Sequence, residues 1–293
     1  MDYIIKMTVK NFTNQIKSAS RRLPFLYTPL KVGSIQLPKL YLLLFICTIY
    51  TTYLVNGPWY SVSMMTILLS HELGHFFMCR KYNVSATLPF FLPMPFGPFG
   101  TFGAVIKMKG QMPSKKALFD IGAAGPIAGL VFAIPIIIIG LYCSEVIPTH
   151  GAHYLSLGEP ILFSVLSKAV FGNIPNGYDI FLHPVAFAGW AGLFVTALNL
   201  LPIGQLDGGH IMYALLGERK SKIVFKIGVF GFCLIAILIY HGWIVFAILL
   251  ILFGFRHPAP FDPVSSIGRK RQLIGIGMFI LFLLSFTPIP LKF

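Results

Sequence analysis

The chain has 293 residues, of which 56% are hydrophobic and only 11% are charged, and its mean hydropathy is +0.79. Soluble domains carry roughly 25% charged residues, so this composition excludes an ordinary soluble protein and predicts one that crosses a membrane several times. The formal net charge is +14, but the basic residues border predicted membrane spans instead of lining a groove, which excludes nucleic acid as a partner. The four cysteines lack paired spacing, so neither a disulfide framework nor a cysteine zinc site is expected.

Residues 1–39 form a basic segment that we expect to be cytoplasmic. The segment contains no apolar stretch typical of a cleavable signal peptide. Apolar residues recur at helical spacing among lysines and arginines, at Ile5, Val9, Phe12 and Ile16. This pattern predicts a basic amphipathic helix on an anionic membrane surface; a mobile basic tail is the alternative.

The first two membrane spans are expected at about Leu40–Val55 and 59–79, joined by a turn at Asn56-Gly57-Pro58. Residues 84–110 are apolar but rich in proline and glycine, which makes a spanning helix improbable. We expect short β-like pieces there, for example Thr101–Met108. They would dip into the membrane beside the functional site, because non-helical backbone at that depth must be covered by protein or face a water cavity.

The third span is expected at about Ala117–Tyr142, where small residues at every third or fourth position would let helices approach closely. Asp120 lies near its inner end and is expected to be solvated. Residues 143–182 are interpreted as a polar loop. The remaining spans are expected at about His183–Leu201, 225–240, 243–255 and Gln272–Phe286.

The placement of charge supports this topology. With a cytoplasmic N-terminus, all but two of the 23 lysines and arginines fall on the inner side, the exceptions being Lys168 and Lys292. Such a bias favours seven spans with the C-terminus outside, and we expect a bacterial inner (cytoplasmic) membrane.

The predicted fold is therefore an all-α polytopic membrane protein. It has about seven transmembrane helices and a re-entrant β-like segment next to a three-helix catalytic core. We expect a basic N-terminal segment at 1–39, a membrane-embedded core at 40–210 and C-terminal transmembrane helices at 211–293.

The second span carries the most informative motif, His71-Glu72-Leu73-Gly74-His75. On a helix, His71 and His75 lie one turn apart on the same face, so both imidazoles can reach one metal ion. Glu72 can take a proton from a water held by that metal, as in the H-E-x-x-H motif of zinc hydrolases. Ionisable residues inside an apolar span are costly, which favours a functional role.

Asp207 is the candidate third ligand. It lies just past the inner end of the span 183–201, at a depth comparable with that of the two histidines, and nearby proline and glycine would loosen the chain there. Two histidines, a carboxylate and a water complete a tetrahedral catalytic zinc site. The alternative is a simple turn, since Asp-Gly is a common turn sequence. His210 is interpreted as interfacial, on a mobile helix end.

Two motifs together resemble the site-2 protease family of intramembrane zinc metalloproteases. They are H-E-L-G-H on one span and N-x-x-P-x-x-x-L-D-G on a later one, the second met at Asn199, Pro202, Leu206, Asp207 and Gly208. The resemblance covers roughly residues 40–210. Because the chain has no room for a PDZ or CBS domain, the resemblance is to the minimal form of the family.

The resemblance implies Zn²⁺ as cofactor, His71, His75 and Asp207 as its ligands, and Glu72 as general base. It implies an intramembrane endopeptidase that hydrolyses a peptide bond within or near a transmembrane segment of a membrane-anchored substrate, as in regulated intramembrane proteolysis. The expected partners are thus a transmembrane protein substrate and the lipid bilayer. The sequence indicates no oligomeric state.

Three further residues are candidates for substrate contact. Asn199, about two helical turns before Asp207, could hydrogen-bond the substrate backbone or a developing oxyanion; alternatively, it only holds helices together. The strand near Gly103 and Ala104 could pair with an unwound substrate by β-addition.

Other functions compete with proteolysis. A metal or ion transporter could use His71, His75 and Asp207 as a transit site, but transporters usually contain repeated halves, and none is evident. Other membrane metalloproteases with H-E-x-x-H use a downstream glutamate as third ligand, and no suitable glutamate follows here. An inactive relative acting as a membrane chaperone is disfavoured, because all the expected catalytic residues are present.

Overall fold

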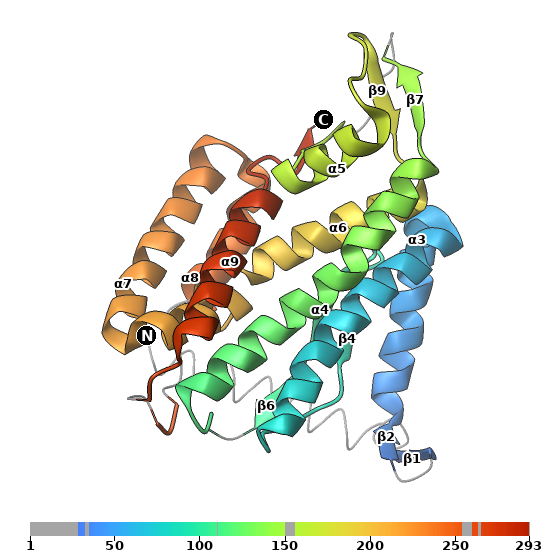
Figure 1. Cartoon of the computed structure of the whole chain (residues 1–293). Helices are drawn as coiled ribbons and strands as arrows, with labels where there is room; N and C mark the ends of the chain where they lie inside the picture. The colour runs from blue at the N-terminus through green and yellow to red at the C-terminus, as the bar shows by residue number, and fades with distance from the viewer. Residues whose placement is uncertain are drawn as a thin grey trace.

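The computed structural model describes residues 29–32, 35–109, 111–149, 156–253, 260–262 and 265–292. Helices dominate it (Figure 1). The apolar and basic positions of the predicted N-terminal amphipathic helix lie outside the described residues. Two short strands, β1 (Pro29–Val32) and β2 (Ile35–Pro38), precede the first long helix.

The helix α3 (Lys39–Lys81) consists of two helices that meet at a sharp bend. Asn56 and Gly57 have non-helical backbone angles, and Gly57 has a φ of 74°, which a residue without a Cβ adopts readily. The two halves run side by side in opposite directions (Figure 1), and Ser61 Oγ donates a 3.0 Å hydrogen bond to the carbonyl of Ile49 across them. The predicted turn at Asn56-Gly57-Pro58 is confirmed.

The segment after α3 forms strands, as its proline and glycine content predicts. These are β3 (Ser85–Ala86), β4 (Phe90–Pro93), β5 (Thr101–Val105) and β6 (Met108–Lys109). β4 and β5 form an antiparallel hairpin with Phe91 opposite Ala104, and β3 pairs with β6. The predicted strand Thr101–Met108 is therefore divided into two. That this segment enters the membrane stays a prediction.

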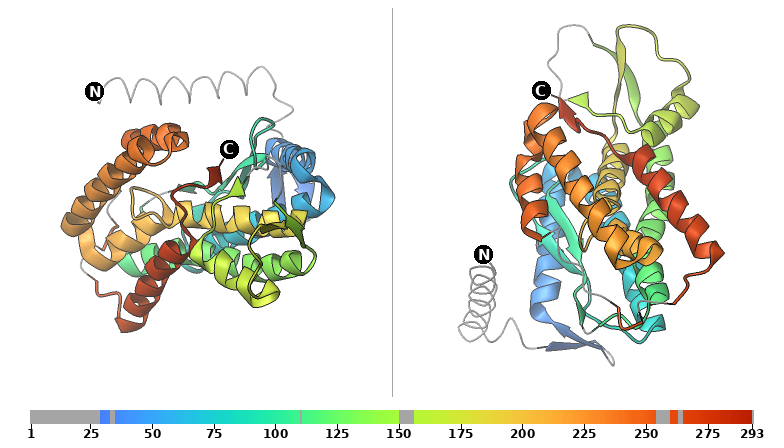
Figure 2. Two further views of the ribbon diagram at one scale, coloured as in Figure 1. Left: turned by 90° about the horizontal axis from the view of Figure 1, so that it is seen from above. Right: turned by 90° about the vertical axis from the view of Figure 1, so that its left-hand side faces the viewer.

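Three helices pack around the centre of the molecule: α4 (Lys115–Tyr142), α6 (Pro184–Asn199) and the first part of α7 (Asp207–Leu238). α4 contacts α3, α6 and α7, and two views at right angles agree on this arrangement (Figure 2). Glycines on α4 make the close approach to α3 possible. A Cβ on Gly129 would lie 3.3 Å from His71 Cβ, and one on Gly125 would overlap the His75 ring. The predicted close packing by small residues is confirmed.

Residues 143–182 contain regular structure that the polar composition did not predict. α5 (Ile161–Phe171) is a short helix that buries Phe163, and β7 (Glu145–Pro148) pairs antiparallel with β9 (Tyr178–Phe181). β8 (Ser156–Leu157) pairs with the C-terminal strand β10 (Leu291–Lys292). The interpretation as a plain loop was wrong, because an 11-residue apolar helix is too short to register as a membrane span.

The C-terminal helices follow a second bend. Within α7, Gly217 has a φ of 75° and divides the helix in two. The short 3-10 helix His241–Trp243 then leads into α8 (Ile244–Phe253), and α9 (Arg269–Ser285) returns across the molecule. These elements correspond to the spans expected at 225–240, 243–255 and 272–286, with ends shifted by a few residues.

The Asp120 carboxylate is 16% exposed and paired, whereas the sequence interpretation expected a solvated side chain. Arg271 of α9 donates two hydrogen bonds to its carboxylate, of 2.7 and 2.8 Å, and the hydroxyl of Tyr82 donates another. Burial and the neighbouring Asp120 carboxylate raise the pKa of Tyr82, so its hydroxyl remains a donor at neutral pH. The charge at residue 120 thus joins α9 to α4 and to the end of α3.

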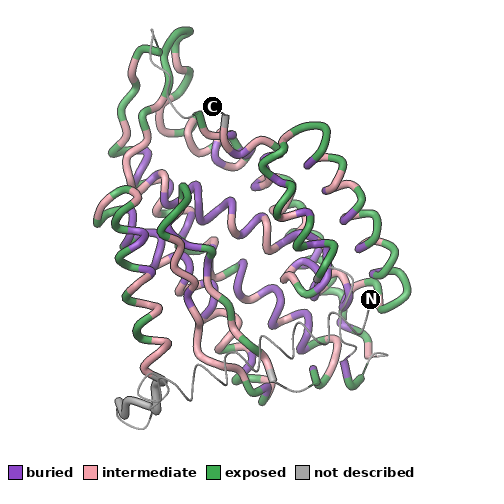
Figure 3. Tube along the Cα trace, turned by 180° about the vertical axis from the view of Figure 1, so that it is seen from behind, coloured by how far each residue is buried: buried purple, intermediate pink, exposed green. Residues whose placement is uncertain are grey.

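Among the described residues, three helices are long and apolar enough to cross a membrane by length and composition: α3, α4 and α7. Buried residues gather on the central helices, whereas exposed residues dominate the outer helices (Figure 3). Many of these exposed residues are large and apolar, such as Ile227, Val245 and Leu283, which is typical of a lipid-facing surface. The protein is therefore a mostly helical membrane protein, while the count of seven spans stays a prediction.

Candidate metal centre

His71, His75 and Asp207 converge although 136 residues separate the first from the last. His71 Nε2 lies 3.1 Å from Asp207 Oδ2, and His75 Nε2 lies 3.2 Å from Asp207 Oδ1. The two Nε2 atoms are 3.2 Å apart. The second half of α3 supplies the histidines and the start of α7 supplies the carboxylate, so these two helices build the cluster.

The surroundings fix how each imidazole is presented. His75 Nδ1 lies 2.7 Å from the carbonyl oxygen of Ile121 on α4, which can only accept a hydrogen bond. The proton is therefore on Nδ1, and the lone pair of Nε2 points into the cluster. Gly125 and Gly129 of α4 pack directly against the rings of His75 and His71. The helix α4 thus acts as a rigid support behind both histidines.

The donor set fits a zinc ion. Ligands about 2.1 Å from a tetrahedral zinc lie roughly 3.4 Å from one another. Here the two Nε2 atoms are 3.2 Å apart, and one ligand atom from each of the three residues lies within 4.8 Å of the other two. Two neutral imidazoles and one carboxylate are also the ligand types of catalytic zinc sites, which leave a fourth position open. His71 is only 4% exposed and Glu72 6% exposed, so solvent contributes little to holding these groups.

Asp207 is held differently from the expectation. α6 ends at Asn199, and Asp207 is the first residue of α7, not a loosened end of the preceding span. Gly208 and Gly209 pack against the backbone of the connecting turn, where a Cβ on either would overlap the carbonyl oxygen of Leu200 or Gly204. The two glycines therefore allow a tight turn that locks the carboxylate in place.

A cavity of about 170 Å³ opens onto the cluster. Its lining contains most of the candidate residues predicted from sequence: His71, Glu72, His75, Ala104, Asn199 and Asp207. Asn199 Nδ2 lies 3.3 Å from His71 Nε2. Gly103 is buried in β5 but is not part of this lining, and its N–H is bonded to Thr101 Oγ1 at 2.9 Å.

His210 belongs to this cavity as well, and the interpretation that it lies on a mobile helix end was wrong; its position at the membrane interface stays a prediction. The side chain is 7% exposed and lines the cavity together with Gln205 and Leu206. A Cβ on Gly122 of α4 would lie 2.9 Å from His210 Cβ, so the two helices meet closely there. The spacing from Asp207, one helical turn, was the signal in the sequence that pointed to the cavity.

Two imidazoles, a carboxylate and a buried glutamate, set in helices long enough to cross a membrane, are the arrangement of a membrane metallohydrolase. Comparison with protein families agrees with this class. The model of peptidase family M50 matches residues 59–239, and the chain belongs to that family. The predicted resemblance to the site-2 protease family is confirmed.

Curated relatives are plant proteins. The chain is 31% identical over 235 residues to the probable chloroplastic zinc metalloprotease EGY1 of Oryza sativa subsp. japonica, which covers 77% of this chain and 40% of the relative. It is 30% identical over 237 residues to the probable chloroplastic zinc metalloprotease EGY1 of Arabidopsis thaliana, with 77% and 42% covered. The chain thus spans about two fifths of the length of these relatives. Zinc, the predicted metal, is named in their descriptions.

Proposed function

We propose that the chain is an intramembrane zinc endopeptidase that hydrolyses a peptide bond within or near a transmembrane segment of a membrane-anchored protein. The observation that carries this proposal is the convergence of His71, His75 and Asp207 beside Glu72 in one cavity. Membership of peptidase family M50 supports the reaction type. Helices with exposed apolar surfaces support a substrate that arrives through the bilayer.

His71, His75 and Asp207 would hold the zinc ion through two Nε2 atoms and a carboxylate oxygen. When bound, zinc supplies a Lewis acid that acidifies water and polarises a carbonyl group. Glu72 accepts the proton of the attacking water and delivers it to the leaving amine, which requires a carboxylate within reach of the cavity. Glu72 is only 6% exposed, so bulk water does not solvate its carboxylate as it solvates a carboxylate on the protein surface.

Asn199 is proposed to stabilise the negative charge that develops on the substrate carbonyl oxygen. Its amide lines the cavity and lies beside His71. An amide N–H aimed at this oxygen contributes most in the transition state, when the charge is largest. The end of α6 holds the side chain at this position.

The edge of β5 is proposed to bind the substrate backbone. Among the strands that the structure describes, β5 pairs only with β4, and Ala104, Val105 and Ile106 line the metal-site cavity. An extended peptide could add to the free edge by backbone hydrogen bonds. Ala104 would lie at the pairing edge. Gly103 has a φ of 94° and its N–H is already bonded to Thr101, so it would bend the strand in a way that presents Ala104 to the substrate.

In the proposed topology, the N-terminus and the metal site lie toward the cytoplasmic side of the membrane, where most lysines and arginines are expected. The bacterial inner membrane is the predicted location; the relatives are chloroplastic by name. The core at 40–210 and the C-terminal helices at 211–293 are proposed as the catalytic and accessory parts.

Glu72→Gln is the variant that tests this function. The purified full chain, reconstituted in liposomes with a transmembrane test substrate, should contain about one zinc per molecule in both forms. Only the wild type should cut the substrate, because the amide cannot accept the proton. Cleavage that survives in the variant would remove Glu72 as the base. A wild type without zinc would refute the proposed site as a whole.

A further inference from the structure

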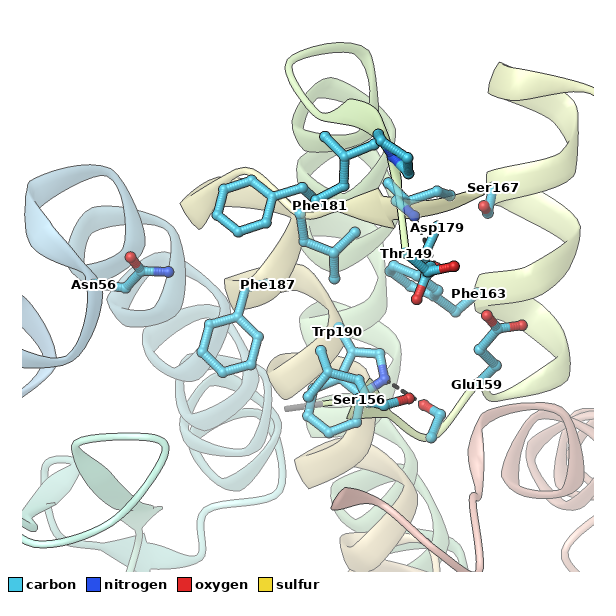
Figure 4. A pocket seen from close by; sticks show the side chains of 16 residues that line it. Asn56, Thr149, Ser156, Glu159, Phe163, Ser167, Asp179, Phe181, Phe187 and Trp190 are labelled. Carbon is cyan, nitrogen blue, oxygen red and sulfur yellow. Dashed lines mark hydrogen bonds between the residues drawn. The ribbon is translucent and has the colours of Figure 1, made fainter. Parts of the chain in front are cut away.

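A second and larger cavity lies at the opposite end of α6 from the metal centre. Its volume is about 460 Å³, and β7, β9, α5, α6 and the bend of α3 surround it (Figure 4). Phe187 of α6 lines its floor, and the fully buried ring of Trp190 stacks against Phe187 at a centroid distance of 6.1 Å. The proposed catalytic chemistry uses none of these residues.

Two carboxylates are presented to this aromatic cavity. Asp179 comes from β9 and Glu159 from the turn before α5, and Figure 4 shows both on the same side of the cavity. Asp179 Oδ1 accepts a hydrogen bond from the N–H of Ile180, and Glu159 Oε2 accepts one from the hydroxyl of Ser164. Among the residues that the structure describes, neither carboxylate forms an ion pair. The cavity therefore combines two accessible aromatic side chains, Phe187 and Phe181, with two exposed carboxylates that no described cation neutralises.

Aromatic faces and carboxylates together attract a cation with an apolar stem. A lysine or arginine side chain meets this description, because its methylene groups pack on aromatic rings while its charged end pairs with carboxylates. The cavity is also large enough to admit such a side chain. Cavities of about 300–1,000 Å³ usually hold drug-sized ligands, and one lysine or arginine side chain is smaller than these.

The position of the cavity relative to the metal centre suggests where that side chain would come from. Phe187 lines the cavity and Asn199 lines the metal site, and they are 12 residues apart on α6. At 1.5 Å per residue this separation is about 18 Å along the helix axis. A substrate helix lying alongside would place a residue about 12 positions from the scissile bond at the cavity.

Trp190 connects the two regions physically. Its ring packs against Phe99 in the loop between β4 and β5 at a centroid distance of 6.1 Å, and the hydroxyl of Tyr60 donates to the Phe99 carbonyl. The same hairpin carries Ala104, which lines the metal centre. The floor of the cavity and the proposed substrate strand thus rest on one continuous group of aromatic side chains.

We propose that this cavity is a second substrate-binding site, which holds a lysine or arginine flanking the transmembrane segment of the substrate at the end away from the metal centre. The proposal rests on the proposed function. Basic residues are rare on the non-cytoplasmic side of membrane proteins, so a requirement for one there would separate substrates from most other membrane segments.

The test compares three substrates that differ only at the position about 12 residues from the scissile bond, which carries lysine, alanine or glutamate. Binding to the full chain in nanodiscs is measured with the Glu72→Gln variant, so that the measurement does not depend on hydrolysis. The lysine substrate should bind about fivefold more tightly than the alanine substrate, and the glutamate substrate more weakly than either.

Asp179→Asn and Glu159→Gln should each reduce the preference for lysine while binding of the alanine substrate stays unchanged. Glu145→Gln is the matched control, since Glu145 is exposed on β7 and does not line the cavity; it should keep the full preference. Asp179→Lys should reverse the order and favour the glutamate substrate. In the cleaving enzyme the same preference should appear in KM and not in kcat.

A preference for lysine that survives both cavity variants would overturn the proposal. Equal weakening of all three substrates would also overturn it, because that result indicates a structural or lipid-binding role for the cavity. Failure of the wild type to cut any substrate would refute the proposed function alone, since the binding comparison would still decide this inference.

Discussion

The packing of α4 against the metal ligands allows a graded prediction. Gly125→Ala would place a Cβ 2.5 to 2.6 Å from two carbons of the His75 ring, Cε1 and Cδ2. Non-bonded carbon atoms prefer a separation of about 3.5 Å, so the ring must move by about 1 Å or α4 must retreat. A functional site tolerates a displacement of only about 0.5 Å.

We expect Gly125→Ala to weaken zinc binding by about 10- to 100-fold, the range seen when groups that support metal ligands are changed. Gly129→Ala should have a smaller effect, because its Cβ would lie 3.2 Å from the nearest atom of His71. Gly231→Ala is the matched control: it lies in α7, where a Cβ meets nothing within 4 Å. Alanine at residue 231 should leave zinc affinity unchanged and favour the helix.

Zinc affinity in this series is measured by competition with a chromophoric chelator on purified protein, with thermal unfolding recorded in parallel. The expected order of affinity is Gly231→Ala equal to wild type, then Gly129→Ala, then Gly125→Ala. If Gly125→Ala binds zinc as tightly as Gly231→Ala, α4 does not position His75 for metal binding. If Gly125→Ala lowers thermal stability but not zinc affinity, the glycine serves packing only.

Three other predictions concern the ion pair between Asp120 and Arg271 that joins α4 to α9, the proposed role of Asn199, and the requirement for zinc. Asp120→Asn should lower the free energy of unfolding by about 1–3 kcal/mol, since it weakens the hydrogen bonds from Arg271 and Tyr82. Chemical denaturation should show no such loss for Glu218→Gln, which breaks an exposed ion pair. Equal stability of the two variants would contradict a stabilising role for Asp120. Asn199→Ala should lower kcat about 100-fold with zinc content unchanged, whereas loss of zinc in proportion to activity would make Asn199 a support for His71. Removal of zinc by a chelator should abolish cleavage and lower the unfolding temperature, because the ligands join α3 to α7. Addition of Zn²⁺ should restore cleavage and the original unfolding temperature. Cleavage by metal-free protein would refute the role of zinc.

Local patterns carried much of what the sequence revealed. His71 and His75 are four residues apart on one helix, so their convergence follows from helical geometry alone. The proline and glycine content of residues 84–110 predicted strands in place of a helix, and the glycines of α4 predicted close packing. In each case the physical cause acts over a few residues.

What the sequence did not reveal depends on contacts between distant segments. Asp120 and Arg271 are 151 residues apart, and only the return of α9 beside α4 brings them together. Asp207 was expected at the loose end of one span, but it starts the next helix after a tight turn. The same error led to the prediction that His210 lies on a mobile helix end. A residue one turn into a packed helix is buried, whereas a residue at a frayed end is exposed.

X-ray absorption at the zinc edge, recorded on the purified full chain, identifies the atoms that bind the metal. With His71, His75 and Asp207 as ligands, the spectrum should show two imidazole nitrogens and oxygen neighbours at about 2.0–2.2 Å, without sulfur. His75→Ala should remove one imidazole, and Asp207→Ala should remove one oxygen neighbour while both imidazoles remain. A sulfur neighbour, or spectra that stay unchanged in both variants, would contradict this account of the site.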